Sequence, residues 1–193
     1  MINRNMSFVA GLLPDGRSRI PAICLAIIAG TMILTLSAKV QVPFYPVPMT
    51  LQTGAVLLIG IIFGARLGAL TVLAYLFEGA IGIPVFAGTP EKGMGIAYLA
   101  GPTGGYLLGF IPAAFIAGWI TSQTDRTLVV GSGMFAAMAA IYLPGAAWVT
   151  YLFGWSVALY SGILPFILGD LLKIIILIIF MHFSTTWLRR DHP

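Results

Sequence analysis

Six long apolar runs restrict the fold of this chain more than any other feature. They lie at about residues 21–38, 48–64, 65–83, 104–121, 128–151 and 162–183. A helix of roughly 20 apolar residues crosses the hydrocarbon core of a membrane, where backbone polar groups must find their partners inside the protein. Only 8% of the 193 residues are charged, whereas a soluble domain carries about 25%. The sequence therefore predicts an all-α membrane protein with six transmembrane helices in a single domain.

The positions of the basic residues predict how the helices are oriented. Lys and Arg favour the cytoplasmic side of a membrane protein. A cytoplasmic N-terminus places Lys39 and Lys92 outside and the following residues inside: Arg4, Arg17, Arg19, Arg66, Arg126, Arg189 and Arg190. An even number of spans returns the C-terminus to the cytoplasm, in agreement with this count. We expect cytoplasmic tails at 1–20 and 184–193 around a bundle at 21–183, in the cell membrane.

The composition also excludes several classes of function. The net charge of +4 comes from basic residues that flank the apolar runs, which favours contact with lipid headgroups over nucleic acid. Cys24 is the single cysteine and lies within the first run, so an intrachain disulfide or a cysteine-rich metal site is excluded. We expect membrane lipid as a partner, no nucleic acid and no cofactor.

Motifs for catalysis are missing from the sequence. Residues 88–93 have the glycine spacing of a phosphate-binding loop, but Met94 and Gly95 replace the Lys and Ser/Thr that the loop requires. Asp170 is the only aspartate in a predicted span, whereas an intramembrane aspartyl protease needs two. We expect a protein that is not an enzyme, so that any ATP hydrolysis takes place on another subunit.

Two charged residues, Asp170 and Lys173, lie in the middle of the last apolar run. A charge at the centre of a spanning helix costs about 2.5–3.5 kcal/mol. Their i, i+3 spacing places both on one face of a helix, and we expect that face to point into the bundle. Two interpretations follow from the residues alone: an ion pair that only locks the helix packing, or a site for a ligand with NH donors and a carboxylate.

Other candidate residues have weaker signals. Glu78 lies toward the outer end of the third run and either joins the same pocket or reaches the membrane interface. Lys92 lies in a Gly- and Pro-rich outer segment, 84–103, which we expect to be an ordered loop that covers a site. It is either a second cation for an anionic ligand or a solvated lysine.

Small residues repeat every four positions along the first run, at Ala22, Ala26 and Gly30. Such a stripe allows another helix to pack closely. Spacing alone does not say whether that neighbour belongs to this chain or to a partner.

Four motifs occur in order along the chain: PVPMTLQT at 46–53, YLFEGAIGIPVF at 75–86, GPTGGY at 101–106 followed by Gly109 and Phe110, and Gly169-Asp170 with Lys173. Together they resemble the BioY family, the biotin-binding S components of energy-coupling factor (ECF) transporters. The resemblance covers residues from about 20 to about 180.

The resemblance implies a six-helix S component that captures biotin from outside the cell. It also implies a transmembrane coupling protein and two cytoplasmic ATPase subunits as partners. In the family the acidic and basic residues of the sixth helix bind biotin, which carries over to Asp170 and Lys173. A carboxylate suits the NH groups of the ureido ring and an ammonium suits the valerate, although the two residues could exchange these roles through water. Tyr106 is expected in the apolar wall of the pocket, and Ala22, Ala26 and Gly30 are expected to contact the coupling protein.

Two alternatives stay open at the level of sequence. One is a biotin carrier that works alone as a homo-oligomer, because a single chain does not prove that partners exist. The other is an intramembrane enzyme that uses Asp170.

Overall fold

The structure, a computed structural model, describes residues 19–124 and 126–190, apart from the side chains of residues 182 and 184–190. Most of the two predicted tails, at 1–18 and 191–193, lies outside the described residues. Residues 184–190 are helical and belong to the last helix, which runs to Arg190. The predicted end of that helix at residue 183 was therefore too early.

Each of the six predicted runs contains a helix, as the hydropathy of the sequence indicates. These helices are α2 (Arg19–Lys39), α3 (Gln52–Phe63), α4 (Ala65–Ala80), α6 (Gly104–Gln123), α7 (Thr127–Phe153) and α9 (Leu164–Arg190). Gly64, at φ 81°, makes the sharp turn between α3 and α4, because glycine adopts positive φ without a steric penalty.

Short elements connect the helices at one end of the bundle. An antiparallel hairpin pairs β1 (Gln41–Val42) with β2 (Met49–Thr50), and α5 (Ile96–Leu99) follows the loop after α4. The short helix α8 (Trp155–Val157) and the π-helix η2 (Ala158–Ile163) lead directly into α9. The residues at 48–51, predicted as the start of the second run, thus belong to the hairpin and its turn into α3.

Within the residues that the structure describes, four apolar segments have the length of a membrane span: Arg19–Lys39, Gly104–Gln123, Thr127–Phe153 and Trp155–Met181. Helix α3 has 12 residues and α4 has 16, which correspond to roughly 18 Å and 24 Å, less than the roughly 30 Å of the hydrocarbon core. Four segments of spanning length make this a multi-pass membrane protein. The count of six spans stays a prediction.

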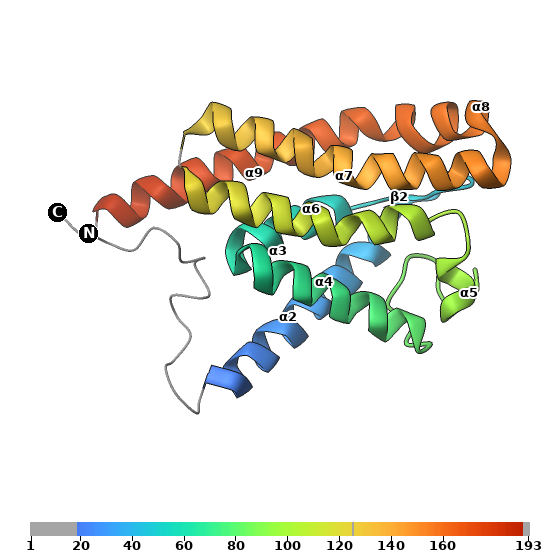
Figure 1. The fold of residues 1–193 in the computed structure, drawn as a ribbon, viewed down its shortest axis with the longest axis horizontal. Coiled ribbons are helices and arrows are strands. Elements are labelled where there is room, and N and C mark those ends of the chain that lie inside the picture. The colour runs from blue at the N-terminus through green and yellow to red at the C-terminus, as the bar shows by residue number, and fades with distance from the viewer. Residues whose placement is uncertain (1–18, 125, 191–193) are drawn as a thin grey trace.

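Helix α6 lies at the centre of the arrangement and packs against α3, α4 and α7 (Figure 1). Helix α7 runs beside α6, while η2 and α9 cover α7, and α9 also contacts α3. Helix α2 crosses the lower part of the view obliquely, and its first turn lies at the same end of the bundle as the last turns of α9 (Figure 1). The hairpin, α5 and α8 lie toward the opposite end.

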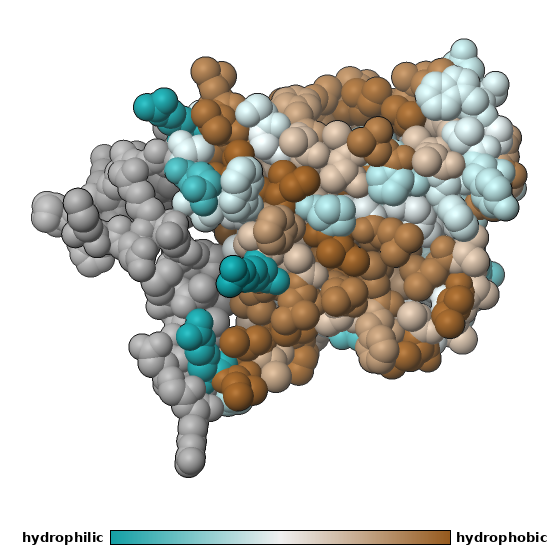
Figure 2. Space-filling view, in the orientation of Figure 1, coloured by the Kyte–Doolittle hydropathy of each residue, from teal (hydrophilic) through white to brown (hydrophobic). Residues whose placement is uncertain are grey.

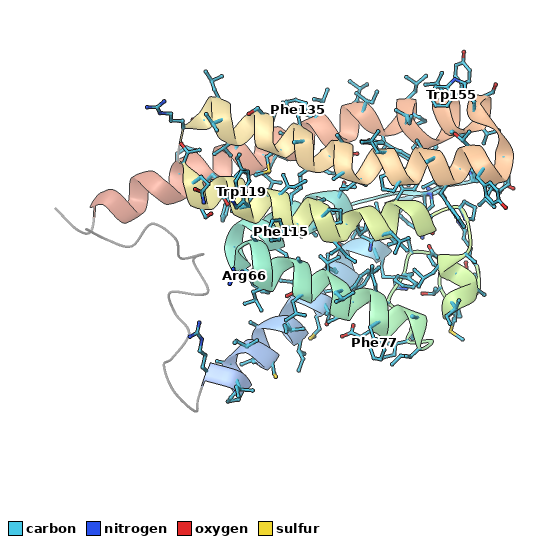
Figure 3. All side chains as sticks on the ribbon, viewed as in Figure 1. Arg66, Phe77, Phe115, Trp119, Phe135 and Trp155 are labelled. Carbon is cyan, nitrogen blue, oxygen red and sulfur yellow. The ribbon has the colours of Figure 1, made fainter. Side chains whose placement is uncertain are left out.

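The outer surface is apolar around its middle. Figure 2 shows hydrophobic residues across the centre of the visible face and paler, more polar residues toward the end that carries α8. Large apolar side chains on several helices point outward, among them Phe77, Phe115 and Phe135 (Figure 3). Arg66 lies toward one end of the bundle and the exposed Trp155 toward the other (Figure 3). This is the surface that a membrane protein presents to lipid, with an aromatic ring near its interface.

Helices α3 and α6 approach each other at glycines. A Cβ atom on Gly60 would lie 2.3 Å from the carbonyl oxygen of Ala114, and one on Gly118 would lie 2.4 Å from the amide nitrogen of Ala65. Neither distance is sterically allowed, so only glycine permits this contact. The turn between α3 and α4 is therefore held directly against the backbone of α6, and this contact fixes the end of α3 that lies away from the site.

The small-residue stripe of α2 faces largely into this chain. Gly30 is buried, and a Cβ atom there would lie 2.4 Å from Cγ2 of Thr71 on α4. Ala26 is partly buried and packs on the hydrophobic core. The expectation that Gly30 contacts a partner is therefore corrected: its close neighbour is a helix of the same chain. Partner contact through Ala22 and Ala26, both half-buried, stays a prediction.

We predict that Gly118→Val destabilises the bundle by about 1–3 kcal/mol, because the added methyl groups overpack the contact between α6 and the α3–α4 turn. Thermal unfolding in detergent measures the effect. The matched control is Ala136→Val on the exposed face of α7, which should leave the unfolding temperature nearly unchanged. Equal unfolding temperatures for Gly118→Val and the wild type would contradict the close contact.

Candidate ligand-binding site

A cavity lies between the hairpin, α3, α6, α7 and α9, and it holds about 560 Å³ of space, including the part open to solvent. Its walls are mainly apolar, with Met49, Leu107, Phe110, Ile141 and Phe166 among the lining residues. Polar side chains gather in one part of the lining: Gln52, Thr53, Tyr142, Asp170 and Lys173. An apolar cavity with a few convergent polar groups is the usual form of a small-molecule site.

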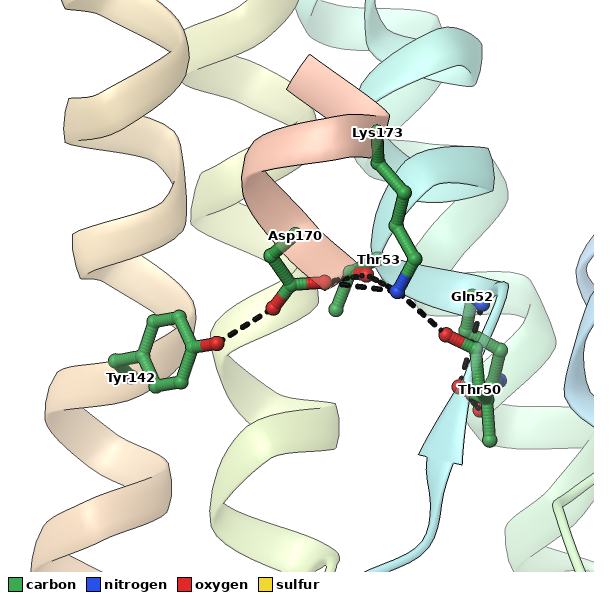
Figure 4. A network of polar contacts seen from close by, with 6 residues as sticks. All are labelled: Thr50, Gln52, Thr53, Tyr142, Asp170 and Lys173. Atoms are coloured by element: carbon green, nitrogen blue, oxygen red, sulfur yellow. Dashed lines mark hydrogen bonds and ion pairs between the residues drawn. The ribbon is translucent and has the colours of Figure 1, made fainter. Parts of the chain in front are cut away.

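Asp170 and Lys173 form an ion pair at this cavity. Nζ of Lys173 lies 2.8 Å from Oδ1 of Asp170, and the two side chains are only 13% and 7% exposed, respectively. Both lie on the same face of α9, as their spacing predicts. The pair thus points into the bundle and borders the cavity, and it is part of a wider polar network (Figure 4).

The partners of the ion pair come from three other elements. Thr53, in the first turn of α3, donates from Oγ1 to Oδ1 of Asp170 at 2.7 Å. Tyr142 of α7 donates its hydroxyl to Oδ2 of Asp170 at 2.5 Å. Lys173 donates to the carbonyl oxygen of Thr50 in β2 at 2.7 Å and to Oγ1 of Thr53 at 2.9 Å (Figure 4). The network therefore joins the hairpin, α3 and α7 to α9.

The hydrogen bonds within the chain use most of the donor and acceptor positions of the ion pair. An ammonium has three hydrogens, and Lys173 directs them to Asp170, Thr50 and Thr53. A carboxylate has about four acceptor positions, and the described side chains fill three of those on Asp170. The ion pair is thus saturated on its basic side, while Oδ2 of the acid keeps one free acceptor position.

A second set of contacts connects the cavity with the loop after α4. Gln52 is buried and donates from Nε2 to the hydroxyl of Tyr75 at 2.7 Å. Tyr75 in turn donates to the carbonyl oxygen of Val85 at 3.1 Å. Two of the sequence motifs, 46–53 and 75–86, are therefore joined in space beside the site.

Tyr106 lines the cavity, where the sequence placed it, and its position is fixed from behind. Its hydroxyl donates to the carbonyl oxygen of Gly162 in η2 at 2.8 Å. A Cβ atom on Gly145 of α7 would lie 2.2 Å from the tyrosine ring, so the ring passes through a gap that only glycine leaves open. The ring of Tyr106 also packs edge-on against that of Tyr142, with centroids 6.5 Å apart. Tyr106 therefore helps to orient Tyr142, whose hydroxyl donates a hydrogen bond to Asp170.

The structure does not bring Glu78 or Lys92 to the cavity. Glu78 is half-buried on α4 and Lys92 is exposed in the loop, and neither is among the residues that line the site. Their part in ligand binding, predicted from charge alone, is not supported by this geometry. Within 19–124 and 126–190, no three His, Cys, Asp or Glu side chains come close enough together to hold a metal ion.

Thr53, Gln52 and Tyr142 are site residues that sequence reasoning missed. The first two lie within the motif at 46–53, where polar residues next to an apolar run were a usable signal. Tyr142 lies inside the fifth apolar run, and nothing in its local sequence distinguishes it from an interfacial aromatic residue.

The fold and the site together define a class: multi-pass membrane proteins with a small-molecule cavity inside a helical bundle. A family model described as the BioY family matches residues 8–190. The chain belongs to the BioY family.

Individual relatives agree with this membership. A probable biotin transporter BioY from Pyrococcus horikoshii is 41% identical over 139 residues, which cover 72% of this chain and 81% of the relative. The biotin transporter BioY of Thermotoga maritima is 35% identical over 147 residues, or 76% and 85% of the two chains. A crystal structure of the S-component for biotin from an ECF-type ABC transporter has the same fold, with a TM-score of 0.74 at 20% identity, over 90% of this chain and 95% of that one.

We predict that Asp170→Asn and Lys173→Met each destabilise the protein by about 3 kcal/mol, because each leaves a buried charge without its partner. The double variant should lose less than the sum of the two single losses, since residues in one network are coupled. Thermal unfolding in detergent measures all three, with the exposed Glu91→Gln as a control for loss of charge. Additive losses would show that the two groups do not depend on each other.

Proposed function

We propose that this chain is the biotin-binding subunit of a vitamin uptake transporter, which captures biotin from outside the cell. Its relatives are named biotin transporters, and they cover most of its length. The observation that carries the proposal is that Asp170, which keeps a free acceptor position, lines a cavity with mainly apolar walls. Transport, and not catalysis, agrees with the names of the relatives.

The chemistry of biotin fits this cavity. Its ureido ring offers NH donors at one end, and its bicycle and aliphatic chain are largely apolar. In this proposal a ureido NH donates to Oδ2 of Asp170, and apolar side chains such as Phe110 and Phe166 cover the rest of the molecule. A hydrogen bond to a charged acceptor is worth about 1.5–3 kcal/mol, which gives the ring end of the ligand a preferred place.

The valerate group then lies away from Lys173. All three hydrogens of that ammonium are already bound within the chain, so a direct contact with the ligand carboxylate would have to break one of them. Thr103, which also lines the cavity, immediately precedes α6, and the first turn of a helix favours an anion. This orientation differs from the one expected from the sequence, in which Lys173 bound the carboxylate.

The orientation of the bundle is part of the proposal. We place the hairpin, the loop after α4 and the cavity on the outer side of the membrane and both termini in the cytoplasm, in one domain with six crossings. The excess of arginine at the predicted inner connections supports this placement. Helices α3 and α4 cross as a pair of short helices, whose ends meet at the turn beside Arg66.

A transmembrane coupling protein and two cytoplasmic ATPase subunits complete the proposed transporter. The sequence of this chain carries no phosphate-binding loop, and the solved structure with the same fold is named as an S-component of an ECF-type ABC transporter. The energy for uptake then comes from other subunits.

We predict that calorimetry on the detergent-solubilised chain detects biotin binding, and that methylation of the ureido nitrogens weakens it at least tenfold. The methyl groups remove the donors that Asp170 accepts, at about 1.4 kcal/mol per factor of ten. Biotin amide should lose less affinity than the ureido-methylated compound, because no ammonium hydrogen is free for the carboxylate. A larger loss for the amide would restore Lys173 as the carboxylate partner.

Two variants serve as controls for this experiment. Asp170→Asn should lose most of the affinity for biotin, while Glu78→Gln should bind as the wild type does, because Glu78 lies outside the cavity. A wild type that binds no biotin at all would refute the proposed function.

We further predict that cells that produce this chain alone take up little labelled biotin, and that co-production of a coupling protein and ATPases raises uptake at least tenfold. Membrane vesicles with and without internal ATP provide the matched comparison. Equal uptake in both would instead establish a carrier that works alone, and the oligomeric state in detergent would then show whether it acts as a homo-oligomer.

A further inference from the structure

One stretch of the loop after α4, residues 84–89, forms part of the outer wall of the cavity, and we call it the wall segment. It has no regular secondary structure of its own beyond turns, yet Val85, Phe86 and Ala87 are all buried, and Ala87 lines the cavity. Irregular backbone in a membrane protein needs partners for its polar groups. Each carbonyl group of this segment therefore needs a hydrogen-bond donor.

Every carbonyl oxygen of the wall segment accepts a hydrogen bond. Side chains of three other elements provide most of the donors: Lys39 at the end of α2, Tyr75 of α4 and Tyr98 of α5. The carbonyl of Gly88 instead accepts from the backbone amide of Lys92 at 2.8 Å. The wall segment is thus held in place mainly by side chains of α2, α4 and α5.

Lys39 makes the largest number of these contacts. Its Nζ donates to the carbonyl oxygens of Phe86 at 2.8 Å, Pro84 at 2.9 Å and Thr89 at 3.4 Å. It also lies 3.2 Å from Oγ1 of Thr89, which itself donates to Phe86. One ammonium therefore gathers three carbonyls of a single loop, and it ties that loop to the last residue of α2.

The two tyrosines hold the inner side of the same segment. Tyr75 donates to Val85, and Tyr98 donates to Ala87. The ring of Phe86 is stacked on Tyr98 at 5.0 Å and meets Tyr75 edge-on at 5.4 Å. Burial raises the pKa of Tyr98, so its hydroxyl remains a donor at neutral pH. These contacts belong to the hydrophobic core, whereas Lys39 acts from the exposed side.

We propose that Lys39 is a positioning residue for the ligand: by gathering the carbonyls of residues 84–89 it keeps Ala87 in place as the outer wall of the cavity. This inference rests on the proposed function, because the ligand it positions is biotin. Lys39 is not among the residues that line the cavity, so it acts through the wall segment and not by contact.

The proposed role of Lys39 in ordering the wall segment can be distinguished from a general role in the stability of the fold. Its side chain lies at the surface, so its removal lets water reach the three carbonyls and creates no hole in the core. The segment loosens while Phe86 remains between its two tyrosines. A site that is formed only a fraction of the time binds its ligand more weakly by that same fraction, so a wall that is ordered one-tenth of the time raises Kd about tenfold.

The experiment compares Lys39→Met, Lys39→Arg and the wild type in two measurements on the full chain in detergent. Calorimetry with biotin should give a Kd about tenfold higher for Lys39→Met and a value near that of the wild type for Lys39→Arg, whose guanidinium can still donate to several carbonyls. Hydrogen exchange without ligand should be faster at amides 85–89 and 91–93 in Lys39→Met but not in Lys39→Arg. The unfolding temperature reports whether each variant is folded.

Lys92→Met is the matched control, because it removes a lysine of the same loop that lies outside the cavity lining. It should leave biotin binding unchanged. Unchanged exchange or unchanged affinity in Lys39→Met overturns the proposal, as does an equal loss in Lys92→Met. A wild type that binds no biotin overturns the proposed function instead, and the exchange comparison then still decides whether Lys39 orders the wall segment.

Thr89→Val, which removes one acceptor of Lys39, should speed up exchange in the same amides and provides a second variant.

Discussion

A lysine and an aspartate stay charged inside an apolar bundle only where enough polar groups surround them, because burial of an isolated charge is very costly. In this protein these groups come from the strand β2, the start of α3 and the middle of α7. The demand for partners therefore brings four separate parts of the chain to one place. The cavity is built around that place, and its shape follows from the packing of the elements that supply the partners.

The same rule explains the side of the cavity that the loop after α4 covers. There the chain leaves helical structure, and its carbonyl groups accept hydrogen bonds from side chains of α2, α4 and α5. Both ends of the site thus depend on polar groups satisfied across elements and not within one helix. Such a site is fixed by tertiary structure as a whole, which agrees with a binding cavity that is formed before its ligand arrives.

Sequence reasoning predicted the helices, the family and the inward face of Asp170 and Lys173 because each depends on local composition or spacing. Hydropathy located the six helical runs, although the small size of α3 and α4 and the hairpin before α3 were not foreseen. Thr53 and Tyr142 were not predicted as site residues, because a hydroxyl in an apolar run does not indicate a site until its partner, far away in sequence, is known. Charge alone did not decide where Glu78 and Lys92 lie, and both are outside the cavity lining. Spacing alone did not show that the close neighbour of Gly30 is Thr71 of the same chain.

Tyr106 is held between Gly145 and Gly162, two glycines that do not line the cavity. A single methyl group at either position would push the tyrosine forward and narrow the space in front of it. The width of the cavity beside Tyr106 thus depends on residues that pack behind the tyrosine and do not line the cavity. An exchange at a position that lines no part of the cavity can therefore restrict a protein with this fold to smaller molecules.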